Sequence, residues 1–243
     1  MPTAVVIDGA YFLRRFSHSF PDFSATDADD IALGVISMAA YHVATRLQAR
    51  PEWTTATQNR FRPEETSELY RIFFYDCPPL RKRVHWPVSG RSLNLGQSDE
   101  ATLRHAVHEK LQTVRKVALR RGRLNEEFSV WRPRPEAVRR WLDDPKNFDP
   151  LDEDFVISPI QKGVDMRLGL DVASMAFKKQ VDQIILVAGD ADFVPATKLA
   201  RREGIDVVLD PMWGQAAHDL IEHVDGIRNC RLSGHPVRSP KTP

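Results

Sequence analysis

Short apolar runs rich in β-branched residues alternate along the chain with longer segments whose apolar residues recur at helical spacing. The apolar runs predict strands at residues 4–7, 69–75, 183–188 and 205–209, with further strands at 116–121, 128–132 and 226–231. The helical pattern predicts helices from Asp27 or Asp29 to about 49, from Asp99 to about 114, at 136–142, from Asp165 to about 179, at 196–203 and at 216–223. This alternation favours an α/β fold with a mostly parallel sheet covered by helices on both faces.

Three stretches interrupt the pattern. Residues 50–68 are polar and hold Pro51 and Pro63, residues 80–98 are basic and predicted to be irregular, and residues 143–154 are acidic. Because the helical pattern resumes after the acidic stretch, we interpret that stretch as an exposed loop and not as a linker. We therefore expect one domain over residues 1–232, with inserted loops at about 50–68 and 80–98, followed by a flexible tail at 233–243.

The composition is that of an ordinary globular protein. The 243 residues are 42% apolar and 28% charged, and 34 basic residues nearly balance 33 acidic ones to give a net charge of +1. No apolar run approaches the roughly 18 residues of a bilayer-spanning helix, and the first residues lack the basic region of a signal peptide. The two cysteines have no metal-binding spacing. We therefore expect a reduced, cytoplasmic protein.

The positive charge is unevenly distributed even though the total is near zero. It gathers in two groups, Arg81, Lys82, Arg83, His85 and Arg91, then Arg115, Lys116, Arg120, Arg121, Arg123, Arg132, Arg134, Arg139 and Arg140. The first group surrounds Trp86, and cations mixed with an aromatic surface are typical of proteins that bind single-stranded RNA. Trp131, Arg132 and Trp141 are a second group of this kind. The alternative interpretation is a buried tryptophan flanked by solvated arginines.

Aspartates follow several of the predicted strands. Asp8 ends the first strand, Asp190 and Asp192 follow the strand at 183–188, Asp165 lies near a helix start, and Asp76 ends the strand at 69–75. Each aspartate alone can be explained as a turn or helix-cap residue. Ligands of open α/β sheets, however, bind at the carboxyl ends of the strands, where several of these aspartates are expected to lie. Two carboxylates about 5 Å apart repel by roughly 3 kcal/mol at an effective dielectric of about 20. A hard divalent cation such as Mg²⁺ or Mn²⁺ would offset that repulsion.

Four segments in this order carry a family resemblance. They are residues 6–10, 71–79, 162–171 and 185–194, and residues 219–225 look like the same family's last helix. On these residues the chain resembles the NYN domain family of PIN-like nucleases, and most closely its LabA-like bacterial branch. The resemblance covers residues 4 to about 230. It departs from the family at Tyr11, where many relatives have Asn, and at Ala188, where many have Ser.

The resemblance implies a three-layer α/β/α fold and a metal-dependent ribonuclease. The family's acidic metal site corresponds to Asp8, Asp165, Asp190 and Asp192, whereas Asp171 lies 600° of helix beyond Asp165 and is a weaker candidate for packing or capping. Mg²⁺ or Mn²⁺ is the implied cofactor, and single-stranded RNA is the implied substrate. The residues expected to contact it are Arg81, Lys82, Arg83, Trp86 and Lys162.

Other functions stay open at this point. A regulatory module that binds RNA or protein and keeps the acidic pocket without turnover gains support from Tyr11 in the usual Asn position. A small-molecule phosphatase is a third possibility, although Ala10 stands where the haloacid type has its second acid. His105 and His108 are close in sequence but lack a third metal ligand, and we expect His218 and His223 to be surface residues. A homo-oligomer is compatible with the sequence.

Overall fold

The core of the molecule is a six-stranded parallel sheet in the order β10-β9-β8-β1-β2-β5. The computed structural model describes residues 2–48 and 62–232. The strands are β1 (Thr3–Asp8), β2 (Leu69–Asp76), β5 (Val117–Arg121), β8 (Gln183–Val187), β9 (Asp206–Asp210) and β10 (Gly226–Ile227). The strand order changes direction at β1, which pairs with both β2 and β8. The switch point of the sheet therefore lies between β1 and β8.

One face of the sheet is covered by α1 (Gly9–Ser19), α2 (Ala28–Leu47) and α4 (Asp99–Thr113). Phe12, Phe16 and Phe20 are spaced four residues apart and form a fully buried ladder under this layer. Asp27, one of the two predicted starting residues, caps α2 by accepting from the backbone N–H groups of residues 29 and 30. The sequence analysis did not predict α1 as a helix.

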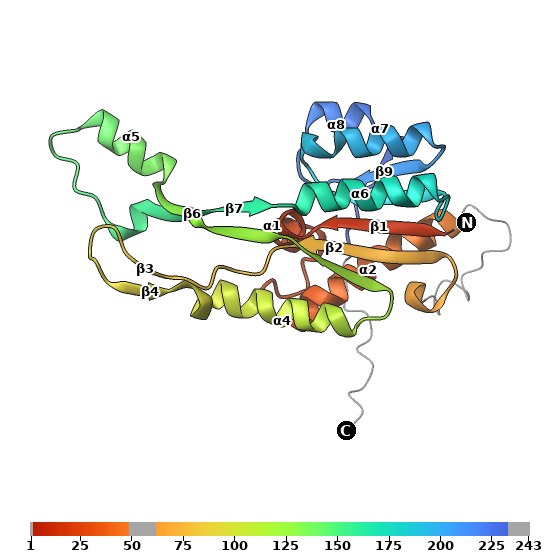
Figure 1. Ribbon diagram of the computed structural model, residues 1–243, viewed down its shortest axis with the longest axis horizontal. Helices are drawn as coiled ribbons and strands as arrows, with labels where there is room; N and C mark the ends of the chain where they lie inside the picture. The colour runs from red at the N-terminus through yellow and green to blue at the C-terminus, as the bar shows by residue number, and fades with distance from the viewer. Residues whose placement is uncertain (1, 49–61, 233–243) are drawn as a thin grey trace, which may run out of the picture.

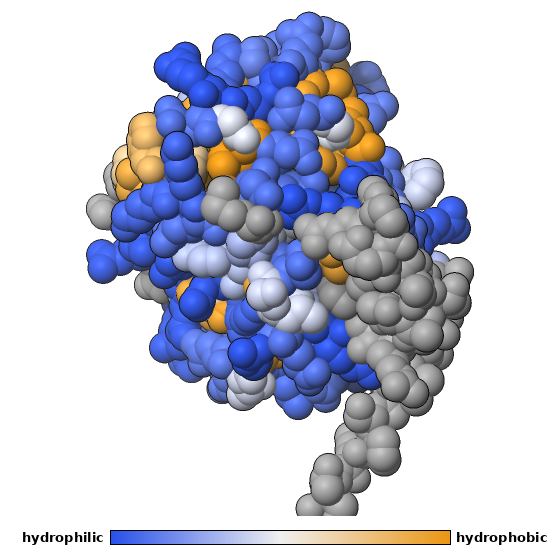
Figure 2. All heavy atoms as spheres, turned by 90° about the vertical axis from the view of Figure 1, so that its right-hand side faces the viewer, coloured by the Kyte–Doolittle hydropathy of each residue, from blue (hydrophilic) through white to orange (hydrophobic). Residues whose placement is uncertain are grey.

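The opposite face is covered by α6 (Val164–Phe177), α7 (Val194–Arg202) and α8 (His218–Glu222) (Figure 1). Leu168, Val172 and Met175 of α6 are buried on this side. The sheet thus has helices on both faces, which confirms the predicted three-layer α/β/α architecture. In Figure 2 the surface is mostly hydrophilic, and separate hydrophobic patches lie mainly in the upper half, at the height of α6 and α7 in Figure 1.

A two-stranded arm leaves the end of β5 and extends to the left in Figure 1. It consists of the antiparallel strands β6 (Arg123–Pro133) and β7 (Phe155–Lys162) with α5 (Pro135–Asp143) at its tip. A second hairpin, β3 (Arg83–His85) and β4 (Ser92–Asn94), lies beside it. Short 3-10 helices occupy Pro63–Glu65 (η1), Leu95–Gln97 (η2), Asp152–Asp154 (η3) and Ala191–Phe193 (η4).

The arm and the neighbouring hairpin correct three predictions. Residues 80–98 were expected to be irregular, yet they hold the β3–β4 hairpin and η2. The carboxylate of Asp152 fixes the hairpin loop by accepting from the backbone N–H groups of Val88 and Ser89 at 3.1 and 3.0 Å. Strand β7 was missed because Pro159 lies inside it, and a proline normally argues against a strand. The third correction concerns length, because the strand expected at 128–132 is part of the longer β6.

Candidate functional site

Asp8 is the last residue of β1 and the N-cap of α1, so it stands at the switch point of the sheet. One of its carboxylate oxygens accepts from the backbone N–H of Tyr11 at 3.1 Å. The chain passes close to β2 here, because a Cβ on Gly9 would lie 2.7 Å from the carbonyl oxygen of Tyr75. The strand before Asp8 is fully buried, whereas Asp8 itself is partly exposed at the carboxyl end.

Asp190 and Asp192 lie in the turn that follows β8, the neighbour of β1. Asp190 caps η4 and accepts from the backbone N–H of Asp192 at 3.2 Å, while both side chains face solvent. Phe193 is buried beneath the turn. The i, i+2 spacing therefore presents both acids at the carboxyl edge of the sheet.

Asp165 connects these acids electrostatically. It lies in the first turn of α6, two residues after the left-handed N-cap Gly163 (φ 80°). Partial burial raises the pKa of the Asp165 carboxyl, and the charges of Asp192 and Asp190 raise it further. Burial also raises the pKa of Asp8, and the charge of Asp165 adds to this effect, whereas the hydrogen bond from Tyr11 opposes it. The fold therefore brings all four predicted aspartates close enough for their charges to act on one another through Asp165.

The donor set is entirely carboxylate oxygen, which fits a hard divalent cation. In the part of the chain that the structure describes, however, the one group of at least three ligand side chains with donor atoms within 4.8 Å of one another is His218, Asp219 and Glu222. The aspartates are thus more widely spaced than a closed cage of protein ligands. Such spacing suits Mg²⁺, which usually keeps several water ligands and takes only one or two carboxylates directly.

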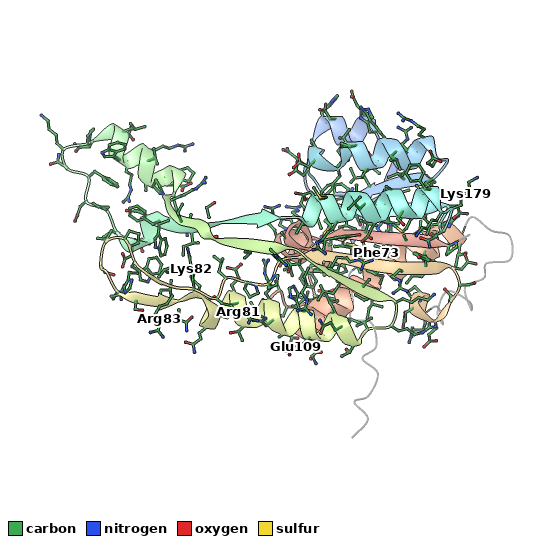
Figure 3. All side chains as sticks on the ribbon, viewed as in Figure 1. Phe73, Arg81, Lys82, Arg83, Glu109 and Lys179 are labelled. Atoms are coloured by element: carbon green, nitrogen blue, oxygen red, sulfur yellow. The ribbon has the colours of Figure 1, made fainter. Side chains whose placement is uncertain are left out.

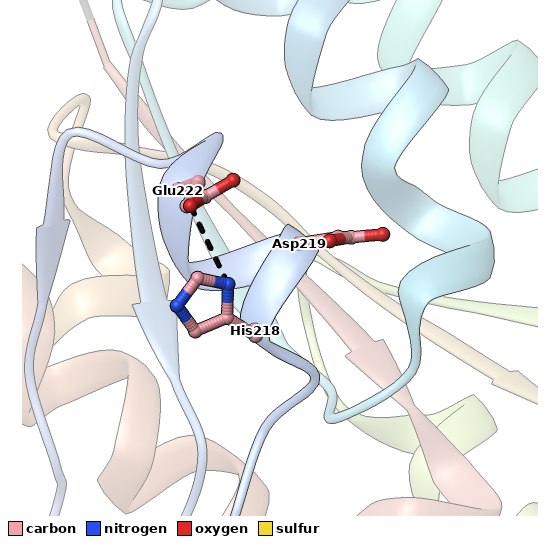
Figure 4. Close-up of side chains that lie close together, drawn as sticks. All are labelled: His218, Asp219 and Glu222. Atoms are coloured by element: carbon pink, nitrogen blue, oxygen red, sulfur yellow. Dashed lines mark ion pairs between the residues drawn. The ribbon is translucent and has the colours of Figure 1, made fainter.

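The compact group on α8 is a different kind of cluster. His218 and Glu222 are one helical turn apart, and the imidazole Nδ1 lies 3.4 Å from a Glu222 oxygen (Figure 4). Asp219 points from the same short helix, and all three side chains are exposed. An exposed i, i+4 pair contributes little stability and needs no metal to explain it. His218 is therefore a surface residue, as the sequence analysis expected.

Asp76 reaches the same end of the sheet but is already neutralised. It is buried at the end of β2, and its two oxygens lie 2.9 Å from Arg104 Nη1 and 2.7 Å from His108 Nε2. Asp171 is likewise engaged, because it accepts from Tyr75 Oη at 2.8 Å and from Arg120 Nε at 2.9 Å. These contacts distinguish Asp76 and Asp171 from the four candidate aspartates, of which only Asp8 feels a cation within the described part of the chain, Arg14, whose charge opposes the rise of the Asp8 pKa.

An open groove of about 580 Å³ runs beside two of the four aspartates. Asp165 and Asp192 line it together with the side chains of Met166, Pro195 and Leu199. A separate cavity of about 240 Å³ lies between α4 and the base of the arm, and its lining includes Arg104. The groove gives an extended molecule access to the acidic edge from the α6 and α7 side.

The predicted substrate-binding residues lie on the arm and its neighbouring hairpin. Figure 3 places Arg81, Lys82 and Arg83 along the hairpin, to the left of the central sheet. Trp86 stacks on Trp131 with ring centroids 4.7 Å apart. The two rings therefore cover part of each other. Whether these residues contact a substrate stays a prediction. The side chain of Lys162, which ends β7, lies outside the described part of the structure.

The sequence analysis missed the role of Tyr11 and the loop after β9. The Tyr11 hydroxyl donates to the carbonyl oxygen of Pro211 at 2.7 Å, and Arg15 donates to that of Met212 at 3.1 and 3.2 Å. A Cβ on Gly189 would lie 2.5 Å from Tyr11, and one on Gly214 would lie 2.6 Å from its hydroxyl. The sequence feature that could have indicated this loop is the Pro-Met-Trp-Gly run just after the strand predicted at 205–209.

Comparison with protein families decides the classification. A family model described as the NYN domain matches residues 106–228, which is just over half of the chain. The chain belongs to the NYN domain family. The NYN match includes Asp165, Asp190 and Asp192, whereas β1 and Asp8 precede it. NYN domains are a PIN-like nuclease group, so an enzyme that acts on RNA is the expectation for this chain.

The other comparisons add nothing to the NYN assignment. Neither a curated protein nor a solved structure gives a significant match to the chain. Among the helices in residues 2–48 and 62–232, none combines the length and the apolar character that crossing a bilayer requires.

Proposed function

We propose that this NYN domain is a metal-dependent ribonuclease that hydrolyses RNA phosphodiester bonds at Asp8, Asp165, Asp190 and Asp192. The observation that carries the proposal is the placement of these four carboxylates at the switch point, where burial and then the charge of Asp165 raise the pKa of Asp8, and burial and then the charges of Asp192 and Asp190 raise the pKa of Asp165. Such repulsion is costly unless a cation offsets it. A bound Mg²⁺ or Mn²⁺ would neutralise the acids and polarise the phosphodiester towards attack by water.

We assign separate roles to the chain's own residues. Asp8, Asp190 and Asp192 hold the cation directly or through water, and Asp165 either joins them or orients the attacking water. Single-stranded RNA is the substrate, because its bases are free to contact aromatic side chains and its backbone to contact the basic groups. Arg81, Lys82, Arg83 and Trp86 on the hairpin, together with Lys162, bind it. We infer that the chain belongs to the LabA-like branch, and that residues 1–232 act as one unit with inserted loops at about 50–68 and 80–98.

The test compares three proteins on labelled single-stranded RNA with Mn²⁺ or Mg²⁺. Wild type should cleave, Asp190→Asn should not, and Asp149→Asn should cleave like wild type, since Asp149 is an exposed acid near the tip of the arm. Both variants remove one negative charge from an exposed position. A difference in RNA cleavage between them would therefore be specific to the aspartate site. Undiminished cleavage in excess EDTA would refute the metal-dependent mechanism.

A non-catalytic module that binds RNA or protein is the alternative. Tyr11 favours it, because the bulky side chain replaces the usual Asn beside Asp8 and is committed to packing against the loop after β9. In the same assay, negligible cleavage by wild type together with RNA binding that survives in Asp190→Asn would support the module over the nuclease.

A further inference from the structure

We propose that the Trp213 indole is a platform on which a base of single-stranded RNA stacks, beside the aspartate site. This inference rests on the proposed function, since it identifies how that site would hold its substrate. Four features of the molecule support it: the shape of the loop that carries Trp213, the hydrogen bonds that anchor the ring, its position at the carboxyl edge of the sheet, and the charges around it.

The loop after β9 holds two consecutive residues in an unfavourable backbone conformation. Met212 and Trp213 have φ angles of 47° and 60°, in the left-handed region that side chains other than glycine seldom adopt. Several contacts impose this shape, including the bonds from Tyr11 and Arg15 to the carbonyl oxygens of Pro211 and Met212. Strain of this kind persists where the surroundings enforce it, and it concentrates at functional sites.

The Trp213 ring is held firmly and yet remains open to solvent. Its backbone N–H donates to Asn229 Oδ1 at 2.7 Å, and its indole Nε1–H donates to the carbonyl oxygen of Cys230 at 3.1 Å. The residue is still 52% exposed. Because the only polar atom of the ring is already paired, the exposed part is aromatic surface, which is suited to stacking and not to hydrogen bonding.

The loop is connected directly to the aspartate site. Tyr11 donates from its backbone to Asp8 and from its hydroxyl to Pro211, so one residue bridges the site and the loop. At the other end of the loop, the N–H of Ala217 donates to the carbonyl oxygen of Gly189, the residue before Asp190. Trp213 follows β9, which is separated from β1 by β8 alone, a lateral distance of about 10 Å at the usual strand spacing. A strand of RNA with a phosphate at the aspartates could therefore reach the ring within a few nucleotides.

The charges around the ring suit a nucleic acid. The Arg231 guanidinium lies over the Trp213 ring, 5.9 Å from its centre, and that of Arg14 lies over the Tyr11 ring, 5.7 Å from its centre. Both arginines are exposed. Arg231 on one face of the indole can neutralise a phosphate next to a base stacked on the other face, while Arg14 adds positive charge at Tyr11, the residue that links the loop to Asp8.

The chain offers a matched control for Trp213. Phe177 is 61% exposed, comparable to the 52% of Trp213, but it ends α6, whose first turn holds Asp165. The described tryptophans Trp86, Trp131 and Trp141 belong to the groups expected to contact RNA, so none of them is a suitable control. Trp213→Ala and Phe177→Ala therefore each remove an exposed aromatic side chain, at opposite edges of the sheet.

The experiment measures binding of a labelled single-stranded oligonucleotide by fluorescence anisotropy, in the Asp190→Asn background so that cleavage does not interfere. Trp213→Ala should weaken affinity about tenfold, the usual effect of losing one stacked base, while Phe177→Ala should leave it unchanged. Trp213→Phe and Trp213→Leu both lose the bond to Cys230, but only Phe can stack, so Phe should bind several-fold tighter than Leu. This pair, with unchanged melting temperatures, separates stacking from a folding defect.

An abasic scan locates the stacked base. One abasic position should weaken binding by the protein that retains Trp213 and have no further effect on Trp213→Ala, because both changes remove the same contact. Equal affinity of the Trp213→Ala and Phe177→Ala proteins, with wild-type cleavage intact, would overturn the platform and leave the nuclease standing. If wild type neither binds nor cleaves RNA, the proposed function fails first and the platform fails with it.

Discussion

Tyr11 occupies the space that a side chain at Gly189 would need. A Cβ on Gly189 would lie 2.5 Å from Cε2 of Tyr11 and 3.0 Å from Cζ, closer than such atoms approach in real structures. Tyr11 cannot easily retreat, because its hydroxyl is bonded to Pro211 and its backbone N–H to Asp8. The tyrosine that departs from the family pattern thus links the Asp8 turn, the Asp190 turn and the loop after β9.

Gly189→Ala should therefore lower the free energy of unfolding by about 1–3 kcal/mol, the usual cost of overpacking a filled site. Gly169→Ala is the matched control, because a Cβ there meets nothing within 4 Å on α6 and should be neutral or stabilising. Urea denaturation measures both. In a double-mutant cycle, Gly189→Ala should cost less in the Tyr11→Asn background than in wild type, since Asn vacates the contested space. Wild-type stability of Gly189→Ala would show that the contact is easily relieved.

Asp76 should matter for stability and not for chemistry. Its carboxylate is buried between Arg104 and His108, and breaking a buried ion pair by removing one partner costs about 3–5 kcal/mol. Asp76→Asn should thus lower the free energy of unfolding by a large part of that range. Asp190→Asn, at an exposed position, should change it little. Chemical denaturation of the two variants tests this contrast. If their stabilities changed equally, Asp76 would not be the structural carboxylate that its contacts indicate.

The sequence was sufficient for the central sheet and for the position of the acids. Strands β1 and β8 are continuous apolar runs followed at once by Asp8 or by Gly189 and Asp190, so both the elements and their ends are visible in the pattern. Parallel pairing then places these ends at one edge without further information. The family pattern added Asp165, which local spacing alone would have left as a helix residue.

The sequence was not sufficient where contacts between residues far apart in the chain determine the structure. Asp76 looks like a fifth metal ligand until Arg104 and His108, 28 and 32 residues later, are seen to neutralise it. Strand β7 is paired to β6 across the whole of α5, although Pro159 argues against a strand locally. The position of Trp213 is fixed by its hydrogen bonds to Asn229 and Cys230, which no local pattern connects with it. These features depend on tertiary pairing that short-range periodicity does not encode.

The burial of Asp8 should make the metal-free protein sensitive to pH. Burial and the charge of Asp165 raise the pKa of this carboxyl above its ordinary value of 3.8. The folded state therefore binds the proton more tightly than the unfolded state, and stability declines as pH rises from 3.8 through the raised value. In EDTA at neutral pH, Asp8→Asn should thus have a higher melting temperature than wild type, because Asn removes the buried charge and still caps α1.

Two further conditions test the same explanation. The stability advantage of Asp8→Asn should shrink as the pH falls towards 3.8, where the wild-type carboxyl is protonated too. Mg²⁺ or Mn²⁺ should raise the melting temperature of wild type more than that of the variant, since a ligand stabilises the state that binds it. A variant that is less stable than wild type in EDTA would mean that the carboxylate is structural, and identical metal responses would mean that Asp8 does not contribute to the site.

Arg83 on the β3–β4 hairpin tests whether this part of the molecule binds RNA. It is exposed at the start of β3 and follows Arg81 and Lys82 in the basic group. A cation that neutralises one phosphate of a single strand contributes about 0.7 to the slope of log affinity against log salt. Arg83→Ala should therefore weaken RNA binding at low salt and reduce that slope by about this amount, with no change in melting temperature.

Arg202→Ala is the control, because Arg202 is also exposed but ends α7, at the opposite edge of the sheet from the aspartates. An unchanged slope for Arg83→Ala, or the same reduction for both variants, would mean that the hairpin contributes only to the general field of the protein and that the RNA path follows another surface.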